Sequence, residues 1–134
     1  MNIGEAARRS GLTTKTIRFY EDIGLVPAAG RDVNAYRRYG EREVHLLHFV
    51  HRARSLGFGV EQCRELLQLY ADRDRASADV KAIAQARIAD IDRKIAELEA
   101  MKATLAELVT RCHGDDRPDC PILEGLAAAG TTVD

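Results

Sequence analysis

The feature that constrains this chain most is a run of apolar residues with the spacing of a coiled coil. From Ala84 onward, positions alternately four and three residues apart carry Ile88, Ile91, Ile95, Leu98, Lys102, Leu105 and Val109. This pattern predicts one continuous helix, at 77–111, with a single apolar stripe along it. Such a helix is roughly 45–50 Å long, and a chain of 134 residues cannot cover the stripe internally. The sequence therefore predicts a homodimer whose interface is formed by every member of the stripe except Lys102.

The N-terminal segment shows two short amphipathic patterns separated by a turn. The first spans residues 2–9, and the second is predicted from the N-cap Thr13 to about residue 23, with Leu12 and Ile17 forming a hydrophobic staple. Two short helices joined by a glycine-containing turn are typical of a helix-turn-helix, whose second helix enters the DNA major groove. The side chains predicted to be exposed on that helix are Thr14, Lys15, Arg18 and Tyr20. They suit contact with phosphates and base edges, although a solvated helix face explains them equally well.

Residues 27–40 are too polar for a core strand and combine basic with aromatic side chains: Arg31, Asn34, Tyr36, Arg37, Arg38 and Tyr39. This composition favours a hairpin wing that contacts the DNA backbone. Two further helices are predicted, at 41–56 with Leu46, Phe49, Val50 and Ala53 buried, and at 60–70 with Cys63, Leu66, Leu67 and Tyr70 facing inward. We therefore expect a mainly α fold, with a winged helix-turn-helix DNA-binding domain at 1–70 followed by the long dimerisation helix.

The distribution of charge supports this division of the chain. Residues 1–58 carry ten Lys and Arg against six Asp and Glu, a net +4, whereas residues 59–134 carry ten against fifteen, a net −5. A basic N-terminal part suits contact with phosphate, and an acidic remainder stays away from it. The sequence contains no apolar run long enough to span a membrane and no secretion signal, so we expect a cytoplasmic location without membrane association.

Two of the three cysteines, Cys112 and Cys120, stand on either side of a seven-residue loop that follows the long helix. Two thiolates with few other ligands suit a soft, two-coordinate monovalent ion such as Cu(I), whereas zinc prefers four ligands. Pro121 is suited to the first position of a helix, which places Cys120 at its N-cap. We expect a metal-binding loop and short helix at 112–126, and a disordered tail at 127–134.

Other interpretations of these residues remain open. Cys112 and Cys120 can close a redox disulfide, and His113 is a possible third ligand that is more often a solvated neighbour. Cys63 lies on an apolar helix face and is expected to be a buried small hydrophobe. Three further histidines repeat at three-residue intervals along one helix and are interpreted as surface or DNA-proximal residues: His45, His48 and His51.

The motifs TIRFYEDIGL and NAYRRY, in this order before a long helix, closely resemble those of the MerR family of regulators. The segments RASADV and CHGDDRPDCPI further resemble the copper-responsive branch of that family. The resemblance implies a dimer with an antiparallel coiled coil that binds a promoter whose spacer is too long for RNA polymerase, and that distorts this DNA when metal binds. It also implies DNA contacts by Lys15, Arg18, Tyr20, Arg31, Tyr36 and Arg37, with Ile17 and Phe19 keeping structural roles.

Ser77 departs from the pattern of relatives that respond to divalent ions. The resemblance places a third cysteine at this position in those relatives, at the start of the dimer helix, so a serine here removes one ligand and favours a monovalent ion. From the sequence, Ser77 is also expected to be the N-cap of the helix, with Asp79 in its first turn.

These observations lead to an expected function. We expect a transcription regulator that responds to Cu(I), with silver and gold ions as further candidates, and that activates copper-efflux or resistance genes. No nucleophile elbow, P-loop or dinucleotide motif is present, so an enzyme is not expected. Two alternatives are a redox or divalent-metal sensor that uses the same cysteines and an architectural coiled-coil protein.

Overall fold

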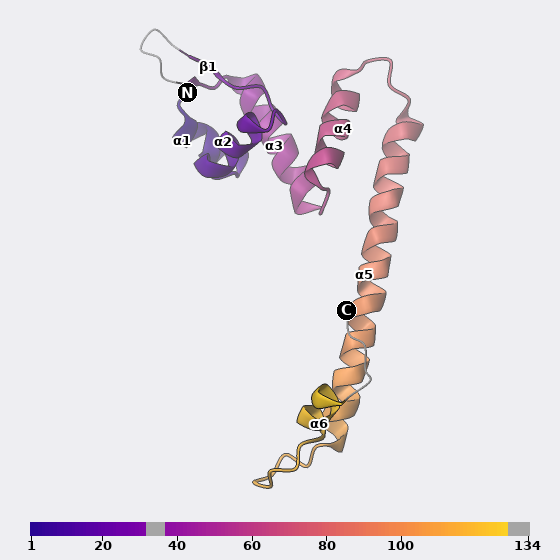
Figure 1. Ribbon diagram of the computed structural model, residues 1–134. Helices are drawn as coiled ribbons and strands as arrows, with labels where there is room; N and C mark the ends of the chain where they lie inside the picture. The colour runs from indigo at the N-terminus through magenta and orange to yellow at the C-terminus, as the bar shows by residue number, and fades with distance from the viewer. Residues whose placement is uncertain (32–36, 129–134) are drawn as a thin grey trace. The chain divides into compact units, whose positions relative to one another are not determined.

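The computed structural model describes residues 1–31 and 37–128. Its elements follow the order α1, α2, β1, β2, α3, α4, α5 and α6 (Figure 1). They form two compact units, which divide within α5: Met1–Arg87 and Ile88–Asp134. The mainly helical fold predicted from the sequence is confirmed, with a two-stranded antiparallel hairpin as the sheet of the described chain.

The helix-turn-helix consists of α1 (Ile3–Ser10) and α2 (Thr14–Asp22). Each helix begins after a side-chain cap: Asn2 Oδ1 accepts from the Glu5 amide at 2.9 Å, and Thr13 Oγ1 accepts from the Thr16 amide at 3.1 Å. These bonds satisfy amides that have no partner within the first helical turn. Gly11 ends α1 at φ +86°, a left-handed conformation that glycine adopts without steric cost. The predicted helix pair is confirmed to within one residue at each boundary.

The wing is a hairpin of β1 (Gly30–Arg31) and β2 (Arg37–Arg38), in which Gly30 pairs with Arg38 and Arg31 with Arg37. The strands confirm the predicted hairpin. Its tip, residues 32–36, lies outside the described residues, and so do the predicted contact residues Asn34 and Tyr36.

Two helices, α3 (Glu41–Ser55) and α4 (Val60–Ala71), complete the hydrophobic core of the first unit. The Glu43 and Gln62 side chains accept from the amides of the N-cap residues Gly40 and Gly59, at 3.0 and 2.9 Å, and so cap the starts of the two helices. The core contains side chains from all four helices and from the segments between them: Ala6, Ile17, Tyr20, Leu25, Val26, Tyr39, Val44, Leu47, Val50, Ala53, Phe58 and Cys63.

The predicted inner faces of α3 and α4 are partly wrong. In α3, Val50 and Ala53 are buried as expected. Leu46 and Phe49 were also expected to be buried but are only half-buried, and Val44 and Leu47 are buried instead. In α4, Cys63 is fully buried and Leu66 and Leu67 pack against the core, whereas Tyr70 is 44% exposed. Tyr70 instead stacks on Phe49, with ring centroids 5.1 Å apart, and its hydroxyl lies 2.8 Å from His45 Nε2.

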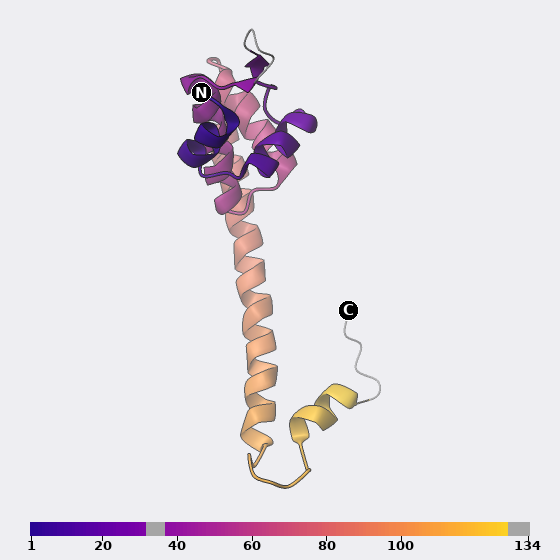
Figure 2. The same cartoon turned by 90° about the vertical axis from the view of Figure 1, so that its left-hand side faces the viewer.

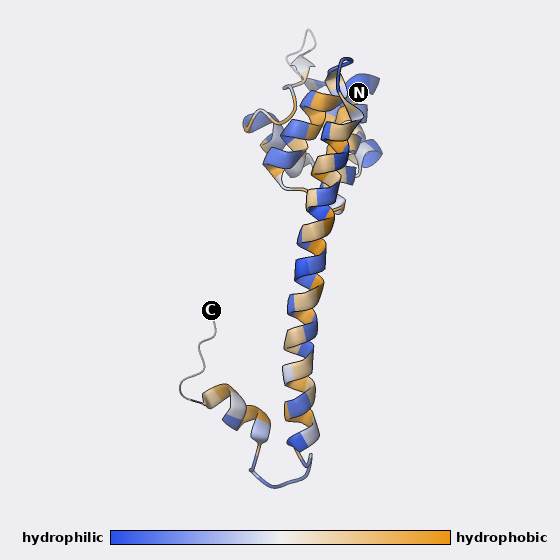
Figure 3. Ribbon diagram, turned by 90° about the vertical axis from the view of Figure 1, so that its right-hand side faces the viewer, coloured by the Kyte–Doolittle hydropathy of each residue, from blue (hydrophilic) through white to orange (hydrophobic). Residues whose placement is uncertain are grey.

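The long helix α5 (Ser77–Arg111) has 35 residues, as the apolar stripe predicts. It begins at Ser77 itself, so the expectation that Ser77 precedes the helix as its N-cap is wrong by one position. Figure 3 shows apolar positions recurring along α5. The six predicted interface side chains are all between 38% and 59% exposed: Ile88, Ile91, Ile95, Leu98, Leu105 and Val109.

The short helix α6 (Pro121–Ala127) lies beside the last turns of α5 (Figure 2). Leu108 is the buried residue of α5, and its side chain approaches Gly125 so closely that a methyl group there would lie 2.7 Å from Leu108 Cδ2. Ala127 was expected in a disordered tail at 127–134 but belongs to α6, and residues 129–134 lie outside the described part. No helix among the described residues is long and apolar enough to cross a membrane.

Candidate nucleic-acid interface and metal loop

The recognition helix α2 has one buried and one exposed face. Ile17, Tyr20 and Glu21 are buried, at the three- and four-residue spacing that places side chains on one side of a helix. The opposite side carries Lys15, Arg18, Phe19 and Asp22, all exposed, and Thr14 is half-buried beside them.

Two predictions for adjacent residues of α2 are therefore wrong. Tyr20 was expected on the exposed face, but it is 6% exposed and belongs to the core. Phe19 was expected to have a structural role, yet 51% of it is exposed. The segment after α2 explains why Tyr20 is buried. Leu25 and Val26 turn back toward α2, and their amides donate to the Tyr20 carbonyl at 2.9 and 3.3 Å. Both side chains pack in the core with Tyr20. Helical spacing alone does not reveal this contact.

The carboxylate of Glu21 connects α2 to both arms of the wing. Its Oε2 accepts from the Ala29 amide at 2.8 Å, just before β1, and its Oε1 accepts from the Tyr39 hydroxyl at 2.9 Å, just after β2. Both Glu21 and Tyr39 are buried, so these bonds are shielded from competing water. The wing and the recognition helix are thereby held in a fixed relation. From the sequence, Tyr39 was expected among the DNA-contacting residues of the wing, and the role of both residues as anchors was not predicted.

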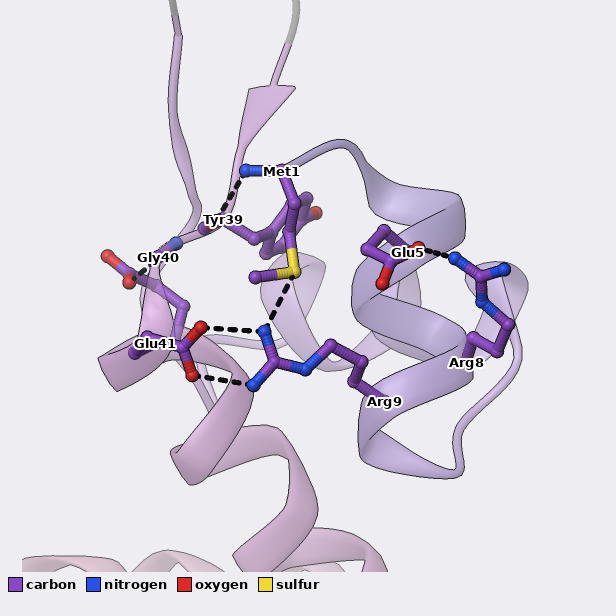
Figure 4. Close-up of polar contacts among 8 residues, drawn as sticks. Met1, Glu5, Arg8, Arg9, Tyr39, Gly40 and Glu41 are labelled. Atoms are coloured by element: carbon purple, nitrogen blue, oxygen red, sulfur yellow. Dashed lines mark hydrogen bonds and ion pairs between the residues drawn. The ribbon is translucent and has the colours of Figure 1, made fainter.

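The N-terminus secures the base of the wing from the other side (Figure 4). Met1 and Tyr39 exchange two backbone hydrogen bonds, with the Met1 ammonium donating to the Tyr39 carbonyl at 2.8 Å and the Tyr39 amide to the Met1 carbonyl at 2.7 Å. Nearby, both terminal nitrogens of Arg9 donate to the Glu41 carboxylate at 2.6 Å. This pairing raises the pKa of Arg9 and lowers the pKa of Glu41, chiefly through the side-chain hydrogen bonds. It ties α1 to the first turn of α3.

Two arginines hold helix ends in the same unit. Arg64 of α4 donates to the carbonyls of Gly24 and Ile23, at 2.9 and 3.2 Å, where α2 ends. Arg87 of α5 donates through Nε to the Leu56 carbonyl at 3.0 Å, where α3 ends. A cation suits the C-terminal end of a helix because the last carbonyls have no helical partner. Neither arginine has a recognisable sequence signal, because each contact joins residues more than 30 positions apart.

A basic groove with a volume of about 880 Å³ lies between α3 and α4. The cationic side chains of Arg42, Arg73 and Arg75 line it, together with His45 and Tyr70. Such walls suit an anionic group such as phosphate. Of these five residues, sequence analysis singled out only His45 as possibly DNA-proximal.

The predicted wing contacts are only partly described. Arg31 and Arg37 form a pair in the hairpin, but their side chains lie outside the described part of the structure, as does the whole of Tyr36. Their predicted contacts with DNA stay predictions.

The predicted metal loop connects the end of α5 to the start of α6. Cys112 follows the last residue of α5, and its amide donates to the carbonyls of Leu108 and Val109 at 3.2 and 3.1 Å. Cys120 is the N-cap of α6 and Pro121 its first residue, as predicted. Both cysteines are half-buried and carry free thiols. Within residues 1–31 and 37–128, no three His, Cys, Asp or Glu side chains come together as a metal site.

The remaining candidate ligands have other surroundings. Cys63 is fully buried, as predicted, and burial raises the pKa of its thiol. His113 is exposed in the loop. On α3, His48 Nδ1 lies 3.4 Å from the Ser10 carbonyl, and the His51 ring lies against Gly11, so both contact the helix-turn-helix turn.

A helix-turn-helix whose second helix exposes Lys15 and Arg18, with a wing anchored to that helix, defines a DNA-binding transcription regulator. Two family models match the chain: "MerR HTH family regulatory protein" over residues 1–70 and "MerR, DNA binding" over residues 44–108. The chain belongs to the MerR family. Its members are DNA-binding regulators, so the expectation of a protein without enzymatic activity is confirmed.

Relatives and solved structures agree with this assignment. The chain is 61% identical to the HTH-type transcriptional regulator HmrR of Rhizobium leguminosarum bv. viciae, over 95% of this chain and 98% of the relative. It is 44% identical to the HTH-type transcriptional regulator CueR of Salmonella typhimurium, over 95% and 92% of the two chains. The crystal structure of the transcription regulator PbrR691 from Ralstonia metallidurans CH34 in complex with lead(II) matches with a TM-score of 0.81 and 32% identity, over 94% and 98% of the two chains.

Proposed function

We propose that this protein is a cytoplasmic, Cu(I)-responsive transcription regulator that binds promoter DNA as a homodimer. On this proposal it activates copper-efflux or resistance genes when metal binding changes the distortion of the promoter and allows RNA polymerase to initiate. Ag(I) and Au(I) share the softness and charge of Cu(I) and are included as inducers. The observation that carries the proposal is the pair of free, half-buried thiols of Cys112 and Cys120 on either side of one loop.

The donor set suits a soft monovalent ion. Two thiolates satisfy an ion that accepts linear two-coordination, whereas a structural zinc site needs four ligands. Two thiolates with a +1 ion leave a net charge of −1, and a +2 ion would give a neutral pair, so the charge of the site differs between the two classes. When bound, the ion would cross-link the two ends of the loop and thereby fix α6 relative to the end of α5.

Ser77 supports the same selectivity by removing a ligand. It is exposed at the first position of α5. In an antiparallel dimer, this end of α5 from one copy would lie near the cysteine loop of the other copy, so its hydroxyl takes the place of a third soft donor. Hydroxyl oxygen is a hard donor and a poor ligand for Cu(I). The similarity to the regulator named CueR supports this choice of metal.

The homodimer is supported by the exposed stripe of α5. Its six apolar side chains are each roughly half exposed, so covering them gains on the order of 1 kcal/mol per side chain. A second copy offers an identical stripe, and the apolar surface would otherwise remain in water.

A divalent-metal or redox sensor is the second candidate. Lead(II) is bound by the similar regulator PbrR691, and two accessible thiols can also be oxidised. Both alternatives use the same cysteines, so the identity of the signal needs a direct binding measurement.

The decisive experiment is an anaerobic competition titration of the reduced protein with Cu(I) against a strong chelator, alongside Zn(II). We expect one Cu(I) bound tightly per chain and weak Zn(II) binding. Cys112→Ser and Cys120→Ser should lose Cu(I) binding and copper-induced transcription while retaining DNA binding. The matched control is Cys63→Ala, which removes a buried thiol and should leave Cu(I) binding unchanged. Zn(II) binding as tight as Cu(I) binding, or no metal binding, would replace the proposal with the divalent or redox alternative.

A further inference from the structure

The exposed face of α2 contains one apolar side chain among charged ones. Lys15, Arg18, Phe19 and Asp22 share this face, because each is three or four residues from two of the others. Half of the Phe19 surface is exposed, although the buried face of the same helix lies only one residue away along the chain. A large apolar side chain in this position has no role in the core.

The core of the unit excludes Phe19 because its neighbours occupy the available space. Ile17 and Tyr20 fill the inward positions of α2, and Leu25 and Val26 pack with them. Phe19 contacts Tyr20 of this cluster, with its ring tilted by 47° to that of Tyr20 at a centroid distance of 5.9 Å. Half of the Phe19 side chain nevertheless remains exposed.

The cations beside Phe19 indicate what covers it. Lys15 and Arg18 are exposed on the same face, and neither forms an ion pair with another described residue. Two cations next to an aromatic ring on the second helix of a helix-turn-helix complement the major groove, where phosphates border the base edges. The apolar group that the major groove offers is the C5 methyl of thymine, which aromatic and other apolar side chains contact.

We propose that Phe19 is a specificity-determining residue that contacts the methyl group of a thymine in each half-site of the operator. The inference rests on the proposed promoter binding through α2 and adds the base that this helix recognises. Lys15 and Arg18 supply attraction to phosphate and hydrogen bonds, while Phe19 discriminates thymine from the other bases and from uracil, which lacks the methyl.

The test replaces thymine by deoxyuridine, which removes only the methyl group. A duplex is first selected in vitro from a random library with the full-length protein, and it should contain at least one thymine at symmetric positions of its two half-sites. Each symmetric thymine pair is then replaced by deoxyuridine, and the dissociation constant is measured by fluorescence anisotropy at one fixed salt concentration. Burial of one methyl is worth about 0.8 kcal/mol, or roughly fourfold in affinity.

For wild type, we expect one symmetric pair of replacements to weaken binding by roughly 15-fold, which is about fourfold at each half-site. Phe19→Ala should bind the thymine duplex more weakly than wild type and should lose this sensitivity. Its dissociation constants for the thymine and deoxyuridine duplexes should differ by less than about twofold, which is the result that a double-mutant cycle gives for a direct contact. Arg18→Ala is the matched control: it should weaken binding to both duplexes and retain the wild-type sensitivity.

Three results would overturn the proposal. Wild type could tolerate every thymine replacement, Phe19→Ala could retain the full sensitivity, or the selected half-sites could contain no shared thymine. If the protein selected no duplex at all, promoter binding itself would fail together with this inference. Circular dichroism of Phe19→Ala checks that the variant is folded, which its exposed position leads us to expect.

Discussion

The bond between Tyr39 and Glu21 allows a quantitative test of how the wing is attached to the recognition helix. Tyr39→Phe removes one hydroxyl and keeps the ring, which is buried in the core. The hydroxyl donates to a buried carboxylate at 2.9 Å, and hydrogen bonds to charged groups contribute about 1.5–3 kcal/mol. We therefore expect the free energy of unfolding to fall by about 2 kcal/mol.

Urea denaturation followed by circular dichroism measures this loss. With a slope of about 2 kcal/mol per molar urea, the transition midpoint should fall by roughly 1 M. Wild type and variant are compared at equal protein concentration, because the proposed dimer formation would contribute to apparent stability. Tyr70→Phe is the matched control, since its hydroxyl bonds to His45 at an exposed position and its loss should cost less than about 1 kcal/mol. Equal losses at the two tyrosines would refute the assignment of Tyr39 as a buried anchor.

Two further predictions concern the cysteines and a turn. In the reduced, metal-free protein, iodoacetamide should alkylate Cys112 and Cys120 rapidly. Cys63 should react only on unfolding, because burial shields its thiol and raises the pKa of that thiol. The rates are measured by mass spectrometry, and equal rates at the three cysteines would contradict this prediction. Gly57→Ala should lower the free energy of unfolding by about 1–2 kcal/mol because Gly57 has φ +88°, whereas Gly4→Ala, at an ordinary helical position, should not lower it.

The sequence predicts those parts of this protein that depend on neighbouring residues. The cap Thr13 acts within one helical turn, so its signal locates the start of α2. The apolar spacing in residues 2–9 likewise locates α1 to within a residue. The heptad spacing likewise predicts the length of α5, because a coiled-coil stripe repeats along the whole helix. Cys120 and Pro121 mark the start of α6 for the same local reason.

Features that depend on distant contacts were mispredicted or missed. Tyr20 and Phe19 are adjacent, and either ring satisfies an amphipathic helix pattern; packing with Leu25 and Val26 decides between them. The buried face of α3 is displaced by one or two residues for a similar reason, because α1 and α4 pack against it at positions that the sequence of α3 alone does not specify. The contact of Arg64 with the end of α2 joins residues about 40 positions apart and leaves no local pattern.

The contacts around α2 limit how a regulator built on this unit can distort DNA. Glu21 ties α2 to both arms of the wing, and Arg64 ties its C-terminal end to α4. Because these bonds join the recognition helix to its neighbours, changing the spacing between α2 and the wing would break several hydrogen bonds at once. Each broken bond would cost about 1 kcal/mol or more in free energy. Under the proposed function, moving each DNA-binding unit as one body is therefore less costly than rearranging its helices. Arg87 connects α5 to the end of α3 within the same unit, so on this proposal the first turns of α5 would move with that body.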